Sequence, residues 1–304
     1  GRTGPLRDVR VSVSPDDAPI REAALPQPPS VTSITGVQAG ERPDVDEIRR
    51  RHEQQYRRAA KTAERKLFQQ ITISHAPAMI ALIADVHLGS PACDVKRAFE
   101  EQDLVNRTPG AYTFLLGDVV DNFIIGKLVA QNMAHGMTIP DEGELFEHYL
   151  DRWENLLAVV GGNHDKWSAM LVGADLRRRF YEDTALYDTD DLRVTVNVGG
   201  HPLLFRLRHK FHGYSQYNVT HGHEKSIMFD DPRPDIVVAG HTHQGALARE
   251  FTHGGKRKIA IQLGTYKSGQ MDDYVRTMGF PQGDSSTAAA VIVMPDGSYF
   301  ATGS

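Results

Sequence analysis

The chain has 304 residues, of which 40% are hydrophobic and 24% are charged, so it can bury the core of one large domain with or without an appendage. Its formal net charge of -5 gives no overall positive field, which argues against tight, non-specific binding to duplex nucleic acid. A single cysteine, Cys93, excludes an internal disulfide framework, and no apolar run near the N-terminus resembles a signal peptide or a membrane span. We therefore expect a soluble, cytoplasmic protein that has no membrane partner.

The N-terminal part differs in composition from the rest of the chain. Residues 1–40 combine six prolines with small and charged residues, which bury too little apolar surface to become ordered, and we expect a disordered tail. Residues 46–70 are charged and favour a helix with Asp44 or Asp46 as the N-cap, which predicts a helical extension over residues 41–75. Acids are interleaved with the arginines, so a solvated face is favoured over nucleic-acid contact, and oligomerisation through residues 46–70 stays open.

Short apolar runs begin at about residue 78 and are typical of buried strands. They are MIALIAD, YTFLLGD, LLAVVGGN, VTVNV, PLLFRLRH, DIVVAGH, KIAIQLG and AAVIVM. Helical patterns at 94–106 and 143–157 separate the early runs, whereas the later runs follow one another closely, which predicts an α/β fold with mixed sheets over residues 76–304. The long amphipathic interval 122–150 predicts a helical insertion near the site entrance.

Four of these runs end in side chains that bind metal ions. The run IALIADVHLG places Asp85 and His87 two residues apart, so a regular strand would direct both to one face, where they could chelate one ion. The other three runs end in Asp118, which follows Gly117, in Asn163 with His164, and in His241 with His243. Four strand ends that carry oxygen or imidazole groups predict a metal site at one edge of the sheets.

The motifs D-x-H, G-D-x-x-D, G-N-H-D and G-H-T-H, in this order, resemble those of the calcineurin-like metallophosphoesterases of the compact microbial or phage type. The resemblance spans about residues 78 to 270, and the ordered set is specific although each motif is short. It implies a four-layer α-β-β-α sandwich, in which helices flank two facing mixed sheets and the metal ions lie at the strand ends. In this chain an N-terminal helical extension would be added.

Carried across residue by residue, the resemblance implies a centre of two divalent metal ions. The ligands of one ion would be Asp85, His87 and His243, those of the other would include Asn163 and His241, and Asp118 would bridge both. Imidazole, carboxylate and amide ligands suit Mn best in our interpretation, with Fe, Zn, Ni or Mg as alternatives.

The same resemblance implies roles for three neighbouring residues. His164 resembles the residue that protonates the leaving oxygen, and Asp165 resembles its orienting partner, although a helix N-cap would explain Asp165 equally well. Asp121 either supports the ligands or caps a turn.

The remaining ligand position has two candidates, His209 and His221. The run HGH at 221–223 has the letters of a histidine pair found in many relatives, whereas His209 ends the strand PLLFRLRH. Metal ligands in this fold lie at strand ends, so His209 is favoured and His221 is the alternative. Arg206 and Arg208 point to the opposite face of the strand from His209, and we expect them to face solvent rather than phosphate.

The resemblance implies two-metal-dependent hydrolysis of a phosphoester, but these motifs are shared by enzymes with many substrates. We expect a phosphodiesterase that acts on a nucleotide or nucleic acid, because of the arginine-rich helix and the insertion. A phosphomonoesterase and a non-catalytic metal-binding interaction scaffold are the alternatives. The scaffold is disfavoured because every motif is filled, including His164.

Overall fold

The computed structural model describes residues 44–67, 69–122, 137–172, 177–213, 217–269, 271 and 287–302. The chain divides into two units, residues 1–55 and residues 56–304, and the second unit contains both β-sheets. The tail expected over residues 1–40 lies outside the described residues.

Helix α1 spans Val45–Leu67 and begins where the charge pattern predicts. The side chain of Asp44 accepts a hydrogen bond of 2.9 Å from the backbone N–H of Asp46, so Asp44 caps the first turn. Arginines of the helix pair with its own acids one turn away, as in Arg49 with Glu53. None of the helices that the structure describes is long and apolar enough to cross a membrane.

The first sheet has the strand order β1-β6-β7-β8-β10-β9. Its strands are β1 Gln69–Ile73, β6 Leu192–Val198, β7 His201–Leu207, β8 Ile236–Ala239, β9 Leu247–His253 and β10 Lys256–Gln262. Strand β1 corrects the boundary expected at residue 75, because residues 69–73 are not helical but pair in parallel with β6. Pairing with a distant strand decides the conformation of this segment, and the local helical composition could not reveal it.

The second sheet has the strand order β12-β11-β2-β3-β4-β5. Its strands are β2 Ala78–Ile83, β3 Ala111–Leu116, β4 Leu156–Val160, β5 Leu186–Asp188, β11 Ala289–Val293 and β12 Tyr299–Thr302. Strands β2, β3, β4 and β5 run parallel to one another. The residues that follow them therefore leave the sheet at one edge.

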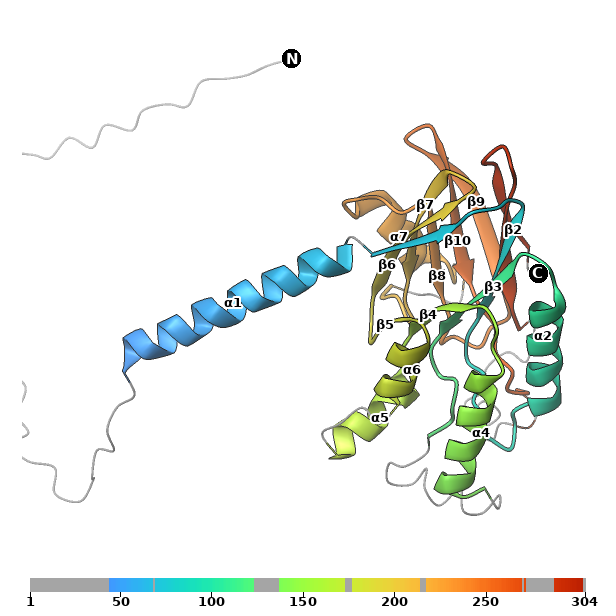
Figure 1. The fold of residues 1–304 in the computed structure, drawn as a ribbon, viewed down its shortest axis with the longest axis horizontal. Helices are drawn as coiled ribbons and strands as arrows, with labels where there is room; N and C mark the ends of the chain where they lie inside the picture. The colour runs from blue at the N-terminus through green and yellow to red at the C-terminus, as the bar shows by residue number, and fades with distance from the viewer. Residues whose placement is uncertain are drawn as a thin grey trace, which may run out of the picture. The chain divides into compact units, whose positions relative to one another are not determined.

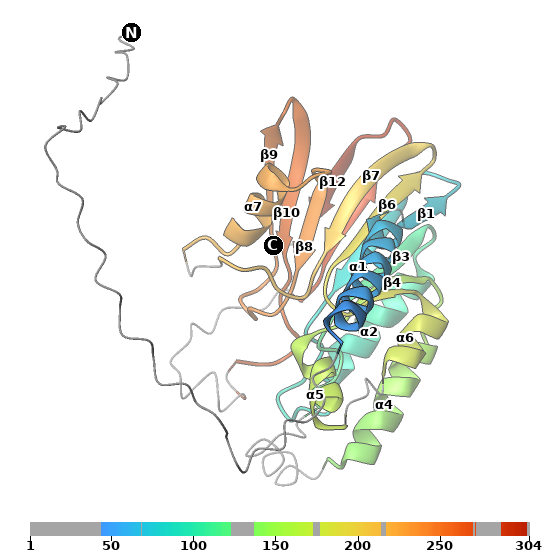
Figure 2. The same cartoon turned by 90° about the vertical axis from the view of Figure 1, so that its left-hand side faces the viewer.

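Helices cover the outer faces of both sheets and complete a four-layer α-β-β-α sandwich, as expected (Figures 1 and 2). They are α2 Val95–Arg107, α4 Ile139–Asp151, α6 Arg178–Thr184 and α7 His221–Phe229, whereas α5 Asn163–Val172 lies beyond the ends of the strands. Figure 2 shows α2, α4 and α6 on one side and α7 on the other. Between the sheets lies an apolar core in which Phe114 and Phe205 meet edge to face, with ring centroids 5.7 Å apart.

Helix α4 occupies the last part of the insertion expected over residues 122–150, and residues 123–136 of that interval lie outside the described residues. A capping box formed by Thr138 and Asp141 starts the helix, which ends at Asp151. Phe146 and Tyr149 of α4 pack in the apolar cluster that also holds the outer-face residues of the second sheet. The helical part of the insertion is therefore packed on the domain.

Arg206 corrects one expectation about strand β7, because its side chain does not face solvent. The residue is only 8% exposed, and its guanidinium donates hydrogen bonds to both carboxylate oxygens of Asp191, at 2.9 and 2.6 Å, to the Ser226 hydroxyl at 3.0 Å and to Asp230. Helix α7 covers this face of the sheet, and its Ser226 supplies one of these partners. The alternation along the strand was predicted correctly, but the covering helix was not.

Candidate metal centre

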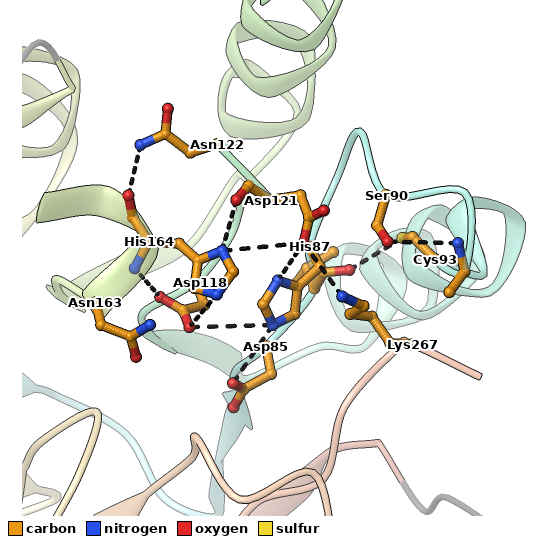
Figure 3. Close-up of polar contacts among 12 residues, drawn as sticks. Asp85, His87, Ser90, Cys93, Asp118, Asp121, Asn122, Asn163, His164 and Lys267 are labelled. Carbon is orange, nitrogen blue, oxygen red and sulfur yellow. Dashed lines mark hydrogen bonds and ion pairs between the residues drawn. The ribbon is translucent and has the colours of Figure 1, made fainter. Parts of the chain in front are cut away.

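The structure brings the expected site residues together where the loops that follow strands of both sheets meet. Figure 3 shows those from the second sheet and the start of α5, which are Asp85, His87, Asp118, Asn163 and His164. Loops after β2, β3 and β4 come from the second sheet, and loops after β7 and β8 come from the first. These loops and the start of α5 carry Asp85, His87, Asp118, Asn163, His164, His209, His241 and His243. The two sheets therefore contribute to one cluster.

The backbone at the cluster has an unusual conformation. Among the described residues other than glycine, positive φ angles occur at Asp85 (53°), His87 (54°), Asp118 (50°), Asn122 (48°), His241 (75°) and His243 (56°). Such angles cost free energy in residues with a Cβ atom and cluster at functional sites. Strand β2 ends at Ile83, so the D-x-H pair is presented by a left-handed loop and not by a regular strand as expected.

Gly117 allows the loop after β3 to approach the loop after β4. Its φ is 84°, and a Cβ atom there would lie 2.6 Å from the Cα atom of Gly162. Another residue at this position would separate the two loops. The glycine therefore lets Asp118 lie next to Asn163 and His164.

One half of the cluster consists of Asp85, His87 and His243, whose ligand atoms lie within 4.8 Å of one another. The Nε2 atom of His243 is 3.1 Å from Asp85 Oδ1 and 3.1 Å from the Nε2 atom of His87. The second oxygen of Asp85 accepts a hydrogen bond of 2.7 Å from the backbone N–H of His241. This bond fixes the carboxylate, so that Oδ1 faces both imidazole rings.

The other half of the cluster consists of Asn163, His209 and His241. The Nε2 atom of His209 lies 3.1 Å from Asn163 Oδ1, 3.2 Å from His241 Nδ1 and 3.0 Å from Asp118 Oδ2. The same Asp118 oxygen is 4.0 Å from the Nε2 atom of His87 in the first half. Asp118 therefore lies between the two groups of donors.

His221, the alternative to His209, lies elsewhere. It is the exposed first residue of helix α7, and it belongs to none of the groups of potential ligands found among the described residues. His209 lies two residues beyond the end of β7, and its Nδ1 atom is 2.8 Å from the carbonyl oxygen of Leu116 in the other sheet. This contact directs Nε2 toward Asp118.

The electrostatics of the cluster favour positive charge. Burial disfavours the ionised form of Asp85, but the charge of His209 and hydrogen bonds from His243 and His87 outweigh it and lower the pKa of Asp85. Asp118 has a lowered pKa for a similar reason, with His209 and His164 outweighing its burial. Buried carboxylates that remain ionised beside imidazole and amide donors are a suitable ligand set for divalent cations such as Mn or Zn.

Asp121 contacts the ring nitrogen of His87 that points away from the cluster, which agrees with its expected role as a support for the ligands. Its Oδ1 atom lies 2.9 Å from His87 Nδ1, so an Nδ1–H can donate to the carboxylate and leave Nε2 to face the cluster. The ammonium of Lys267 is 3.4 Å from the same oxygen and is buried (Figure 3). Lys267 follows β10 in no recognisable motif, so sequence reasoning missed it.

His164 lies at the start of α5 beside Asp118. Its backbone N–H donates to Asp118 Oδ1 at 2.9 Å, and its Nδ1 atom lies 2.5 Å from the carbonyl oxygen of Asp121. The Nε2 atom is 3.8 Å from Asp118 Oδ2. Burial lowers the pKa of His164 to about 4, so the ring is neutral at pH 7, with its proton on Nδ1 and Nε2 directed to the cluster.

Asp165 does not orient His164 as expected. Its Oδ2 atom accepts hydrogen bonds from the backbone N–H groups of Gly162, at 2.7 Å, and Asp118, at 3.2 Å, while Oδ1 accepts one from the Tyr181 hydroxyl. Consecutive residues of a helix point in different directions, and α5 already includes both His164 and Asp165. Asp165 therefore braces two loops, and the carbonyl group of Asp121 orients the imidazole.

Helix α4 also contacts the loops of the cluster, through residues that the motifs do not include. The buried carboxylate of Glu142 accepts the backbone N–H of Asn122, at 3.0 and 3.2 Å, and a hydrogen bond of 3.1 Å from Arg177. Asn122 in turn donates from its side chain to the carbonyl oxygen of His164, at 2.5 Å. Glu142 therefore connects the helical insertion to the backbone of the cluster.

The sequence comparisons agree with this geometry. The family model for calcineurin-like phosphoesterases matches residues 78–245, which is more than half of the chain. No curated protein matches.

Solved structures that resemble the chain share little sequence with it. Vacuolar protein sorting 29 from Cryptosporidium parvum is 16% identical, with 75% of this chain and 97% of that chain covered and a TM-score of 0.39. The nuclease MPE from Pseudomonas putida is 15% identical, with 73% and 87% covered and a TM-score of 0.32. On the family match over residues 78–245, the chain belongs to the calcineurin-like phosphoesterase family.

Proposed function

We propose that the chain hydrolyses phosphoesters with two divalent metal ions. Asp85, His87 and His243 would hold one ion, Asn163, His209 and His241 would hold the other, and Asp118 would bridge them. The observation that carries this proposal is the position of Asp118 Oδ2, 3.0 Å from His209 in one group of donors and 4.0 Å from His87 in the other. A shared carboxylate offsets the repulsion between two neighbouring cations.

Manganese is the first choice for both ions. Imidazole nitrogens outnumber carboxylates in the proposed ligand set, which favours transition metals over calcium, and an amide oxygen is compatible with Mn, Fe, Zn or Ni. Magnesium remains in the set to be tested, because it also accepts carboxylate and amide oxygens.

Bound cations would supply Lewis acidity, which makes water a nucleophile at neutral pH and offsets the charge of the phosphoryl oxygens. The protein's own part is to hold its donors in place before substrate arrives. The hydrogen bond from His241 to Asp85 and that from His164 to Asp118 fix the two carboxylates from the backbone. Little reorganisation is then needed during the reaction.

His164 is the proposed general acid. Its Nδ1 atom is engaged by the Asp121 carbonyl group, so a proton for the leaving oxygen would be held at Nε2, the atom that faces Asp118. Burial keeps the free imidazole neutral, but a negatively charged phosphoryl group beside it favours the protonated ring. The substrate would thereby favour the protonated form of His164, which acts as the general acid.

For the substrate we propose a phosphodiester, of the nucleotide or nucleic-acid class, with phosphomonoesters as the alternative. The arginines of α1 motivated this choice, but Arg49 and Arg51 pair with acids of the same helix. Direct assay of both esters therefore decides between the two classes. Phosphoester hydrolysis itself is supported by the ligand geometry and by the family.

The test is hydrolysis of bis-p-nitrophenyl phosphate and p-nitrophenyl phosphate by metal-stripped protein, with Mn, Mg, Ni or Zn restored. The variant His164→Ala should retain bound metal and lose about 100-fold or more in turnover. His148→Ala is the matched control, because His148 is an exposed residue of α4 that stacks on Phe99. Metal binding without turnover of any ester by the wild-type chain would instead favour the non-catalytic scaffold.

The cytoplasmic location of the protein stays a prediction.

We propose that any self-association takes place through helix α1. A chain that lacks residues 1–67 retains β1 and therefore the complete first sheet. Light scattering after size exclusion should give the same oligomeric state for both chains if α1 has no such role. A change from oligomer to monomer on truncation would assign the role to it.

A further inference from the structure

We propose that Trp167 is a positioning residue for His164, whose imidazole it holds in the orientation needed for proton transfer. The inference rests on the function proposed above, and it extends the site beyond the four sequence motifs. Trp167 lies on α5, three residues after His164, so the two side chains share one face of the helix.

The two rings are close to each other and tilted. Their centroids are 4.0 Å apart, and the ring planes are inclined by 31°. His87 meets the same imidazole edge-on, with centroids 4.6 Å apart and an interplanar angle of 82°. The ring of His164 is therefore packed against both a tryptophan and a proposed metal ligand.

The imidazole of His164 is restrained both through a ring nitrogen and through its ring plane. The contact between Nδ1 and the Asp121 carbonyl oxygen restrains the position of Nδ1. The indole of Trp167 packs against the ring and opposes its rotation about that contact. Nε2 then stays directed toward Asp118, 3.8 Å away.

The chain offers a matched control, because it contains one other tryptophan. Trp153 is 6% exposed and packs in the apolar cluster under α4, where it meets Tyr149 edge-on with centroids 5.7 Å apart. Replacement of Trp153 tests what the loss of a large packed ring does to the domain without altering the contact with His164.

The kinetic test compares a poor leaving group with a good one. A general acid matters most when the leaving oxygen is basic, so phenyl phosphate and p-nitrophenyl phosphate, or the corresponding methyl diesters, report on His164 differently. We expect Trp167→Leu to lower turnover of the phenyl ester about 10- to 100-fold and to change that of the p-nitrophenyl ester much less. Trp167→Phe keeps an aromatic face and should recover most of the loss, and Trp153→Phe should leave the ratio of the two rates unchanged.

A second readout needs no turnover. The carbon-bound imidazole protons of His164 should be shifted upfield by the indole ring current in NMR spectra of the metal-stripped, histidine-labelled full chain, with His164→Ala giving the assignment. Trp167→Leu should abolish this shift, and Trp153→Phe should preserve it. Both measurements use the folded protein, and equal metal content in all variants excludes a disrupted cluster.

Equal losses on the two esters in Trp167→Leu, or a His164 resonance without an upfield shift in the wild-type chain, would overturn the inference. Absence of metal-dependent turnover in the wild-type chain would count against the proposed function instead. In that case the NMR comparison still decides whether Trp167 holds the ring.

Discussion

The Nε2 atom of His209 lies 3.0 Å from Asp118 Oδ2, although the two residues follow strands of different sheets, β7 and β3. The candidate metal centre therefore connects the two halves of the sandwich at the edge where their loops meet. A cation bound by both residues would stabilise the folded state, because the unfolded chain does not hold these ligands together.

We predict that Mn²⁺ raises the thermal unfolding midpoint of metal-stripped protein. A ligand present at 100 times its dissociation constant adds about 2.7 kcal/mol to the free energy of unfolding. Asp118→Asn should abolish this gain, whereas Asp235→Asn should retain it, because Asp235 pairs with Lys258 just before β8, at the opposite end of that strand from His241. Differential scanning calorimetry with and without Mn²⁺ gives the answer, and equal gains in both variants would exclude Asp118 as a ligand.

Metal binding should depend on pH through His87 and His209. Burial lowers the pKa of both, but neighbouring acids outweigh it, mainly Asp121 and Asp85 for His87 and Asp118 and Asp85 for His209, and raise the pKa to about 9 and about 10. Both rings are protonated at pH 7 without metal, so binding must release protons, and the affinity for Mn²⁺ should rise as the pH increases above about 7.

Titration calorimetry in buffers of different ionisation enthalpy measures these released protons directly. The stability of the metal-free protein should fall as the pH rises, whereas its affinity for metal increases. Protonation of His87 and His209 stabilises the fold fully below their ordinary pKa of 6.5, and this stabilisation is lost as the pH rises through about 9 and 10. Proton release that is independent of both histidines would contradict the assignment.

Asp121 should control metal affinity without touching the metal. Its carboxylate accepts the Nδ1–H of His87, and such outer partners contribute about 10- to 100-fold in affinity. We expect a larger loss for Asp121→Ala than for Asp121→Asn, because the amide oxygen can still accept the hydrogen bond. Competition with a chromophoric chelator measures the constants, and wild-type affinity in both variants would show that His87 needs no such partner.

The free energy of unfolding should also depend on pH through Glu142, which is not a proposed metal ligand. Burial outweighs the charge of Arg177 and raises the pKa of Glu142 from about 4.5 to about 7. A carboxyl group with a raised pKa contributes stability below its ordinary value and loses this contribution as the pH rises through the folded value. The free energy of unfolding of the wild type, relative to Glu142→Gln, should therefore fall between about pH 4.5 and 7. Urea titrations of the two proteins across this range test it, and a constant difference would contradict it.

The apolar runs predicted an α/β fold with mixed sheets, and the family resemblance implied its four layers and the residues of the cluster, but neither predicted how the backbone presents these residues. Apolar runs that end in Asp118 or Asn163 mark strand ends whatever follows them, so these positions could be predicted from sequence. The left-handed conformations of Asp85 and His87 could not, because residues with a Cβ atom rarely adopt them and tertiary contacts must impose them.

Other features depend on contacts that no local pattern encodes. Strand β1 was expected to be helical because the residues before it are, but it pairs with β6 as a strand. Lys267 reaches Asp121 from a segment 146 residues away, so no motif could link them. Trp167 differs from these, because its spacing of three residues from His164 places the two rings on one face wherever this segment is helical, as it is in α5.

The most direct test of the two-metal centre is a crystal structure of the protein with Mn²⁺, recorded at a wavelength that gives anomalous scattering from manganese. We expect two anomalous peaks on either side of the Asp118 carboxylate, one beside Asp85, His87 and His243 and the other beside Asn163, His209 and His241. One peak, or two peaks that do not share Asp118, would contradict the proposed centre.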